Sequence, residues 1–140
     1  MKKLIRVAAV ALLASVAETN TAWAQRPSPP GNPTPCNPGT CTLTITVKGD
    51  CKQPGSISID KPFVSTSASV NMRWTIATPG HEFTADGIRF DPPNPQFDVK
   101  NSPKPNEFHI HNKKSKDGDF YYFVNLKGCA PLDPWVRNTN

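Results

Sequence analysis

Apolar and polar residues alternate one by one along several stretches of the chain. The longest stretches have apolar residues at every second position: Leu43, Ile45 and Val47, then Val70, Met72, Trp74 and Ile76. A period of two places successive side chains on opposite faces of a β-strand. The pattern therefore predicts strands at about 41–47 and 70–76, each with one buried face.

Shorter runs of the same kind predict further strands, separated by turn residues. Their apolar positions are Ile57 and Ile59; Phe83, Ile88 and Phe90, around a turn at Asp86-Gly87; Phe108 and Ile110; and Phe120, Tyr122, Val124 and Leu126. Lys116-Asp117-Gly118 predicts a hairpin turn, and Phe97 and Val99 are expected to anchor the proline-rich loop 91–105 in the core. We expect an all-β domain, a two-sheet antiparallel β-sandwich of the immunoglobulin-like kind.

The first 24 residues have the three parts of a secretory signal peptide. Three basic residues within the first six precede an apolar run at 7–17, and the segment closes on Ala22-Trp23-Ala24. The run is shorter than the roughly 20 residues that a membrane-spanning helix needs, and no later segment is apolar enough to span a membrane. We therefore expect cleavage before Gln25 and export to the periplasm or out of the cell.

Removal of this segment changes the charge balance. The whole chain has sixteen basic and eleven acidic residues and a net charge of +5. Residues 1–24 contain three basic residues and Glu18, so thirteen basic and ten acidic residues remain and the net charge falls to +3. The one dense basic cluster, Lys113, Lys114 and Lys116, lies in a predicted turn. A nucleic-acid-binding domain needs a concentrated basic face, so no nucleic-acid partner is expected.

Four cysteines follow the predicted signal peptide: Cys36, Cys41, Cys51 and Cys129. An even number of cysteines in an exported chain indicates two disulfides, whereas a four-thiolate zinc site would need two closely spaced pairs. Spacing alone leaves three pairings open. The first and last strands of immunoglobulin-like sandwiches often lie side by side and parallel, which favours Cys51–Cys129 and leaves Cys36–Cys41.

The segment between the signal peptide and the first strand is rich in proline. Residues 25–38 contain six prolines and few apolar residues that could join a core. Such composition is typical of an extended, flexible linker. The expected organisation is a signal peptide at 1–24, a proline-rich flexible leader at 25–40 and a sandwich domain at 41–140.

His109 and His111 are the residues most suggestive of a metal site. They lie two positions apart on a predicted strand, so both imidazoles project from one face, and His81 is the candidate third ligand of a copper or zinc site. The alternation with Phe108 and Ile110 turns both toward solvent, and no fourth ligand is evident. A blue-copper site is not expected, because no His or Met follows the last cysteine.

Hydrolytic chemistry is only weakly indicated. A Ser-His-Asp arrangement is compatible with three histidines and many serines, but no nucleophile-elbow motif is present. The acidic residues show no spacing that demands a pair of catalytic carboxylates. An exported hydrolase is therefore the third hypothesis, after a binding domain and a metal-binding protein.

The segment 132–138 after the last cysteine combines a turn signal with apolar residues. Asp133-Pro134 starts a turn, and Trp135 with Val136 can dock the tail against one edge of the sandwich. Trp and Arg are also common anchors of interfaces. Docking is the favoured role, and contact with a partner through Trp135 and Arg137 is the alternative.

Several of these features resemble those of a set of small exported proteins of Gram-negative bacteria. The features are Trp74 in its strand, Gly87-Ile88 with Phe90, the aromatic run Tyr121-Tyr122-Phe123-Val124 and the terminal Leu132-Asp133-Pro134-Trp135. The resemblance covers about residues 41–138 and implies an immunoglobulin- or cupredoxin-like sandwich outside the cytoplasm. It implies no catalytic or ligand residue.

The leading functional hypothesis is a non-enzymatic binding domain without a cofactor. It would present loops or a sheet face to a protein or glycan partner in the cell envelope. The competing hypotheses are copper or zinc binding through His81, His109 and His111, and a small exported hydrolase.

Overall fold

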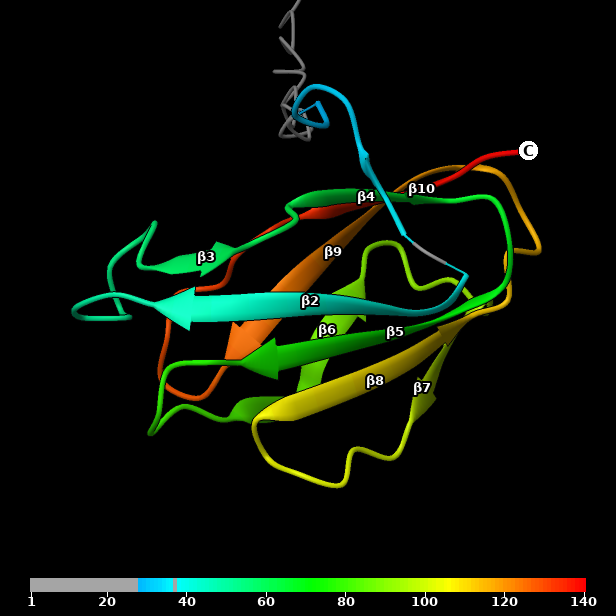
Figure 1. The fold of residues 1–140 in the computed structure, drawn as a ribbon. Coiled ribbons are helices and arrows are strands. Elements are labelled where there is room, and N and C mark those ends of the chain that lie inside the picture. The colour runs from blue at the N-terminus through cyan, green and yellow to red at the C-terminus, as the bar shows by residue number, and fades with distance from the viewer. Residues whose placement is uncertain (1–27, 37) are drawn as a thin grey trace, which may run out of the picture.

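Two facing β-sheets make up the computed structural model, which describes residues 28–36 and 38–140 (Figure 1). Sheet A has the strand order β1-β4-β10-β9-β6 and sheet B the order β3-β2-β5-β8-β7. The strands are β1 (Thr34–Pro35), β2 (Gly39–Val47), β3 (Ile57–Ile59), β4 (Phe63–Thr66), β5 (Val70–Ile76), β6 (Phe83–Phe90), β7 (Phe97–Lys100), β8 (Glu107–Asn112), β9 (Gly118–Leu126) and β10 (Trp135–Asn138). The predicted all-β, two-sheet sandwich is confirmed. The predicted signal peptide at 1–24 lies outside the described residues.

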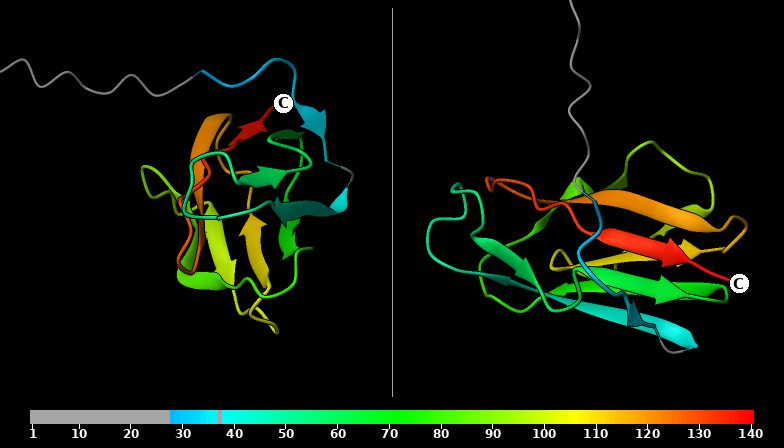
Figure 2. Two further views of the ribbon diagram at one scale, coloured as in Figure 1. Left: turned by 90° about the vertical axis from the view of Figure 1, so that its left-hand side faces the viewer. Right: turned by 90° about the horizontal axis from the view of Figure 1, so that it is seen from above.

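Both sheets are mixed rather than purely antiparallel. β2 and β5 are parallel neighbours in sheet B, and β4 is parallel to both β1 and β10 in sheet A. The remaining strand pairs are antiparallel. Two further views, each turned by 90° from the first, show that the two sheets form two layers (Figure 2).

The longest alternating runs form the strands that the pattern predicts. In β2, Leu43 and Ile45 are fully buried while the alternating threonines, Thr42, Thr44 and Thr46, are half-buried. In β5, Met72 and Trp74 are buried while Asn71 is exposed. The apolar phase of each strand therefore faces the core, because burial of that face removes its apolar area from water.

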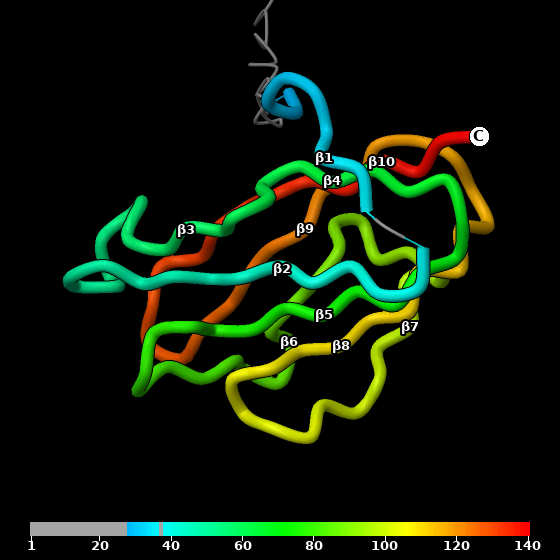
Figure 3. Tube along the Cα trace, viewed as in Figure 1, coloured from blue at the N-terminus to red at the C-terminus, as the bar shows by residue number. Residues whose placement is uncertain are grey.

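Two turn predictions are wrong. Asp86-Gly87 does not end a strand: β6 runs through it, with a shift of pairing register between Phe83 and Ile88. Lys116-Asp117-Gly118 does not close a hairpin, because β8 belongs to sheet B and β9 to sheet A, so the connection crosses between the sheets (Figure 3). Turn residues mark a change of direction, but they do not say which strand comes next in the sheet.

The loop at 91–105 also differs from its prediction. Residues 97–100 form the edge strand β7, and Phe97 is buried as expected. Val99 is 58% exposed, so the prediction that it anchors the core is wrong. Val99 is on the same face of β7 as Phe97, but β7 is the edge strand of sheet B, and at Val99 the facing sheet no longer covers it.

The sandwich begins before residue 41. β1 (Thr34–Pro35) pairs with β4, and the backbone nitrogen of Cys36 donates to the carbonyl of Ser65 at 2.8 Å. Most of residues 34–40, expected to belong to the leader, therefore pair with strands of the domain. β4 itself was not predicted, because Phe63 and Val64 are both buried and the run has no alternation.

Trp74 and Tyr122 join the two sheets at the centre of the core. Both are fully buried, their rings lie edge to face with centroids 5.5 Å apart, and Nε1 of Trp74 donates to the Tyr122 hydroxyl at 3.2 Å. Burial raises the pKa of Tyr122, so the hydroxyl stays neutral. The hydrogen bond satisfies two polar groups that would otherwise be costly to bury.

Both favoured disulfides are present, Cys36–Cys41 and Cys51–Cys129. The reason given for the long-range bridge needs correction, because β2 and β9 lie in different sheets rather than side by side. Their ends meet at one pole of the sandwich, so the bridge ties sheet A to sheet B.

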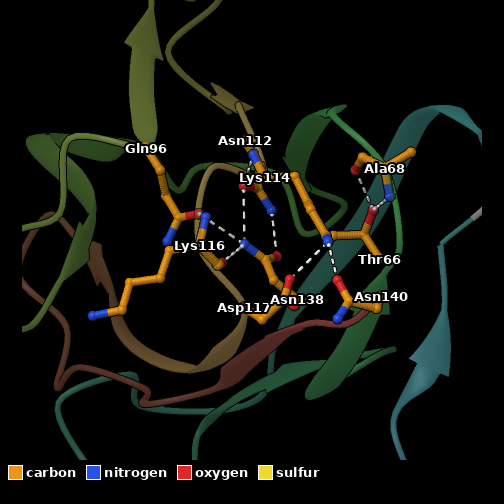
Figure 4. Close-up of polar contacts among 9 residues, drawn as sticks. All are labelled: Thr66, Ala68, Gln96, Asn112, Lys114, Lys116, Asp117, Asn138 and Asn140. Carbon is orange, nitrogen blue, oxygen red and sulfur yellow. Dashed lines mark hydrogen bonds and ion pairs between the residues drawn. The ribbon is translucent and has the colours of Figure 1, made fainter.

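A buried polar cluster lies at the opposite pole (Figure 4). Nδ2 of Asn112 donates to Oδ1 of Asn138 at 2.8 Å, and Nδ2 of Asn138 donates to Oε1 of Gln96 at 2.9 Å and to the carbonyl of Lys116 at 3.0 Å. Asn112, Asn138 and Gln96 are nearly inaccessible to solvent. The cluster fastens β10 to the end of β8, to the β6–β7 loop through Gln96 and to the β8–β9 connection through Lys116. Within the described residues no helix is long and apolar enough to cross a membrane.

Candidate functional site

Four aromatic side chains lie together on the outer face of sheet A. Trp135 of β10 is paired with Tyr121 of β9 on one side and with Phe63 of β4 on the other, and Phe123 follows two residues after Tyr121. The ring centroid of Tyr121 lies 5.1 Å from that of Trp135 and 5.0 Å from that of Phe123, both in edge-to-face geometry. Trp135 and Phe123 are half-buried. Phe63 and Tyr121 are buried beside them. We call Phe63, Tyr121, Phe123 and Trp135 the aromatic surface.

Two arginines lie over this surface. The guanidinium carbon of Arg89 is 4.9 Å from the centroid of Phe123, and that of Arg137 is 4.9 Å from the centroid of Phe63. These are cation–π contacts. Arg137 also donates Nε and Nη2 to the two carboxylate oxygens of Asp119, at 2.6 and 2.9 Å, and this hydrogen bonding lowers the pKa of Asp119.

A hollow of about 220 Å³ opens beside Trp135, next to the β6–β7 loop (residues 91–96). The backbone nitrogen of Asp91 donates to the carbonyl of Tyr121 at 3.0 Å, which holds the start of this loop on β9. The hollow is lined by both aromatic and polar side chains. The aromatic ones are Phe90, Phe120, Tyr121 and Trp135, and the polar ones are Asp91, Asn94, Lys116 and Asp119. We call it the Trp135 hollow.

A larger, apolar groove adjoins the same loop. It has a volume of about 550 Å³ and lies between β6 and the β7–β8 pair, where both sheets end in free edges. Phe90 and Asn94 line both the groove and the Trp135 hollow. Its apolar lining includes Ile88, Phe97, Val99, Phe108 and Ile110. The loop 91–96 thus adjoins two concave sites of different chemistry.

The three histidines do not form one group. His109 and His111 lie on the outer face of sheet B, paired with Arg73 and Asn71 of β5. Nε2 of His109 lies 3.2 Å from Oε2 of Glu107. Burial alone would raise the pKa of Glu107, but hydrogen bonds with His109 and Lys104 outweigh it and lower that pKa.

His81 lies at the pole that carries the long-range disulfide. Its Nδ1 is 3.9 Å from Sγ of Cys129. Across residues 28–36 and 38–140, one group of three His, Cys, Asp or Glu side chains has convergent ligand atoms, and it consists of Cys51, His81 and Cys129. The structure therefore does not join His81 to His109 and His111 in that group.

His111 is part of a hydrogen-bonded chain with a serine and an asparagine. Oγ of Ser69 lies 3.1 Å from Nε2 of His111, and Oδ1 of Asn71 lies 2.8 Å from Nδ1. The amide oxygen can only accept, so Nδ1 carries the proton and Nε2 is free to accept the Ser69 hydroxyl proton. This polarity is that of a nucleophile, a base and an orienting group.

No protein-family model matches the sequence, and no curated protein matches it either.

The sequence indicated parts of these sites. Trp135 and Arg137 were candidate contacts, and both lie at the aromatic surface. Tyr121 and Phe123 were noted only as part of the aromatic run 121–124 and not as contact residues, although aromatic residues in the outward phase of a strand were a usable signal. Ser69 and Asn71 were also missed, because only the register of β5 against β8 brings them to His111.

Proposed function

We propose that the protein is a non-enzymatic binding domain of the cell envelope or its exterior, and that the Trp135 hollow with the aromatic surface recognises a glycan. The observation that carries this proposal is the lining of the hollow, which combines the rings of Trp135 and Tyr121 with the polar groups of Asp91, Asn94 and Asp119.

A glycan fits this chemistry better than an apolar ligand does. Sugar rings offer patches of C–H groups that pack on aromatic faces, and hydroxyls that pair with carboxylates and amides. A few placed polar groups within aromatic walls are the usual composition of a ligand site. The rings and polar groups of the Trp135 hollow are held on paired strands and a fastened loop, so little ordering is required on binding.

Export is supported by two independent features. The first 24 residues have the pattern of a signal peptide, and both cysteine pairs are oxidised. Disulfides of this kind persist in oxidising compartments such as the periplasm and the cell exterior.

Binding of immobilised neutral and acidic oligosaccharides to the purified protein tests the proposal. Trp135→Ala is expected to weaken binding by about tenfold or more, as loss of a central aromatic anchor does at interfaces, while Trp135→Phe retains most of it. Arg73→Ala is the matched control, because Arg73 is exposed on the outer face of the other sheet.

Three results would overturn the glycan assignment. They are absence of binding across the oligosaccharides, equal binding by the wild type and Trp135→Ala, and a partner that remains bound after all glycan has been removed from it enzymatically.

A second candidate function is ester hydrolysis, favoured by the Ser69–His111–Asn71 geometry. In the reaction, Oγ of Ser69 attacks the carbonyl carbon of an ester, its proton moves to Nε2 of His111, and that proton then goes to the departing alcohol. Water hydrolyses the acyl-serine and restores the free hydroxyl. Asn71 holds His111 in the required tautomer but is uncharged, so it stabilises the imidazolium less than a carboxylate would.

Hydrolysis of p-nitrophenyl acetate tests this second function. Ser69→Ala and His111→Ala are each expected to lower the rate by about 100-fold or more, the scale of general-base catalysis. Ser67→Ala is the control, since Ser67 is exposed in the same bend. Equal rates for wild type and Ser69→Ala would exclude the function.

A further inference from the structure

Three chain connections lie at one pole of the sandwich (Figure 1), and each carries a side chain that can bind a metal ion. Cys51 lies between β2 and β3, His81 between β5 and β6, and Cys129 after β9. The ligand atoms of these three residues all lie within 4.8 Å of one another, and each residue is half-buried. Two sulfurs and an imidazole nitrogen therefore converge on one small volume.

Backbone contacts hold this arrangement independently of the sulfur–sulfur bond. The nitrogen of Ala130 donates to the carbonyl of Cys51 at 2.8 Å, directly beside the disulfide. The nitrogen of Lys127 donates to the carbonyl of Glu82 at 2.9 Å, and Nζ of Lys127 pairs with Oε2 of Glu82 at 2.7 Å. Neighbours of all three ligand residues are thus tied together, so we expect the three segments to stay adjacent when the bridge opens.

We propose that reduction of Cys51–Cys129 creates a zinc site formed by Cys51, His81 and Cys129, with water in the fourth position. Two thiolates and an imidazole are a ligand set that zinc accepts in tetrahedral geometry. Zn–S bonds of about 2.3 Å and Zn–N bonds of about 2.0–2.1 Å place the ligand atoms about 3.3–3.8 Å apart. The three ligand atoms already lie within 4.8 Å of one another, and Nδ1 of His81 is 3.9 Å from Sγ of Cys129, so small loop movements suffice.

The chemistry balances with a dithiol as reductant. The disulfide takes two electrons and two protons from the dithiol, which becomes a disulfide itself, and Cys51 and Cys129 become thiols. Zinc then replaces the two thiol protons, which are released to solvent, while Nδ1 of neutral His81 donates its lone pair. In the oxidised protein the sulfurs are not thiolates, so the same residues bind no zinc.

Metal titration of the oxidised and reduced protein tests the proposal. The protein is reduced with a phosphine under anaerobic conditions and titrated with cobalt(II), whose thiolate charge-transfer and tetrahedral ligand-field absorption report the ligand set, and zinc is then used to displace it. We expect one metal per reduced chain and none per oxidised chain. His81→Ala should weaken zinc binding by more than the roughly tenfold that loss of an outer-shell partner costs.

The second disulfide provides a matched control. A Cys36→Ser/Cys41→Ser variant should bind zinc as the wild type does, while Cys51→Ser/Cys129→Ser should not bind. In a mass-spectrometric alkylation assay, zinc should protect Cys51 and Cys129 of the reduced protein and leave Cys36 and Cys41 reactive. Zinc should also raise the unfolding temperature of the reduced protein, because a ligand that binds the folded state stabilises it.

Distinct results would overturn the proposal. They are equal zinc affinity in His81→Ala and wild type, protection of all four cysteines alike, or a reduced chain that unfolds and is not refolded by zinc.

Discussion

The backbone of β6 passes so close to the core at Gly87 that no side chain fits there. A Cβ at this position would lie 2.7 Å from Cβ of Phe83 and 2.9 Å from a ring carbon of Phe108. These are shorter than real Cβ contacts, and both neighbours belong to the core. The close approach coincides with the shift of register between Phe83 and Ile88. Glycine at 87 therefore lets β6 pack against the aromatic pair Phe83–Phe108.

Substitution of Gly87 by alanine should destabilise the fold. The added methyl group must displace Phe83 or Phe108 in a filled core, which costs about 1–3 kcal/mol of the free energy of unfolding. Urea denaturation followed by fluorescence measures it. Ala85→Ser, an exposed change in the same strand, should leave the midpoint nearly unchanged, and equal effects of the two substitutions would contradict the packing argument.

At this scale the sequence predicted inward positions well but interactions poorly. Phe108 and Ile110 face the core, as the alternation predicted. His109 and His111 lie in the opposite phase of the strand. The partners of His111 could not be predicted, because Asn71 lies opposite it only through the pairing of two strands about forty residues apart. Val99 was misplaced because an alternating pattern does not reveal where the facing sheet ends.

Among the elements, β10 is held by buried polar contacts as well as by apolar packing. It lies between β4 and β9, with Val136 fully buried and Asn138 held in the buried cluster with Asn112 and Gln96. Asn138 accepts a hydrogen bond from Asn112 and donates one to Gln96. Its removal therefore leaves each of these two buried amides without one hydrogen bond.

Replacement of Asn138 by alanine is expected to lower the free energy of unfolding by about 1–3 kcal/mol, the cost of leaving buried polar groups unsatisfied. Hydrogen exchange should show the loss of protection concentrated in β10 and β4. Thr139→Ala provides the control, because the contact of Thr139 with Thr66 is made by its backbone nitrogen. Uniform loss of protection across both sheets would argue against a local role.

The pattern misled at β10 for a physical reason. The order Trp135-Val136-Arg137-Asn138 places a large aromatic ring on the outer face and an amide in the core. Hydrophobic alternation assigns residues to the core by polarity, so a buried amide that is fully hydrogen-bonded is invisible to it. The favoured role of Trp135, docking of a tail at one edge, also differs from the structure, since β10 is an interior strand.

For the whole molecule, the two disulfides should contribute unequally to stability. Cys51–Cys129 joins residues 78 apart and bridges the sheets, whereas Cys36–Cys41 joins residues 5 apart. The loop-entropy model gives about 4–5 kcal/mol for the first and about 2 kcal/mol for the second. Thermal unfolding of Cys51→Ala/Cys129→Ala and Cys36→Ala/Cys41→Ala should show the larger loss in the former. The reverse order would mean that the short bridge stabilises the folded state, by holding the edge strand β1 in place, rather than by restricting the unfolded chain.

The architecture was predictable to the level of a sandwich and its disulfides, but not to the order of its strands. Turn residues located the ends of β2 and β5 correctly. Whether a connection closes a hairpin or crosses to the other sheet depends on which faces find a partner, as at 113–117 between β8 and β9. That choice is made by the packing of distant segments, which local patterns do not contain.

The interior position of β10 also orders the events of folding. Of the ten strands in residues 28–36 and 38–140, β10 is the last in sequence, yet it forms the centre of sheet A, with β4 and β9 as its neighbours. As the polypeptide is synthesised from its N-terminus, β4 and β9 emerge while their shared neighbour is still missing. Sheet A therefore cannot close until residue 138 is available. A chain built in this way remains without its complete native sheet until residue 138 has been synthesised, however early sheet B assembles.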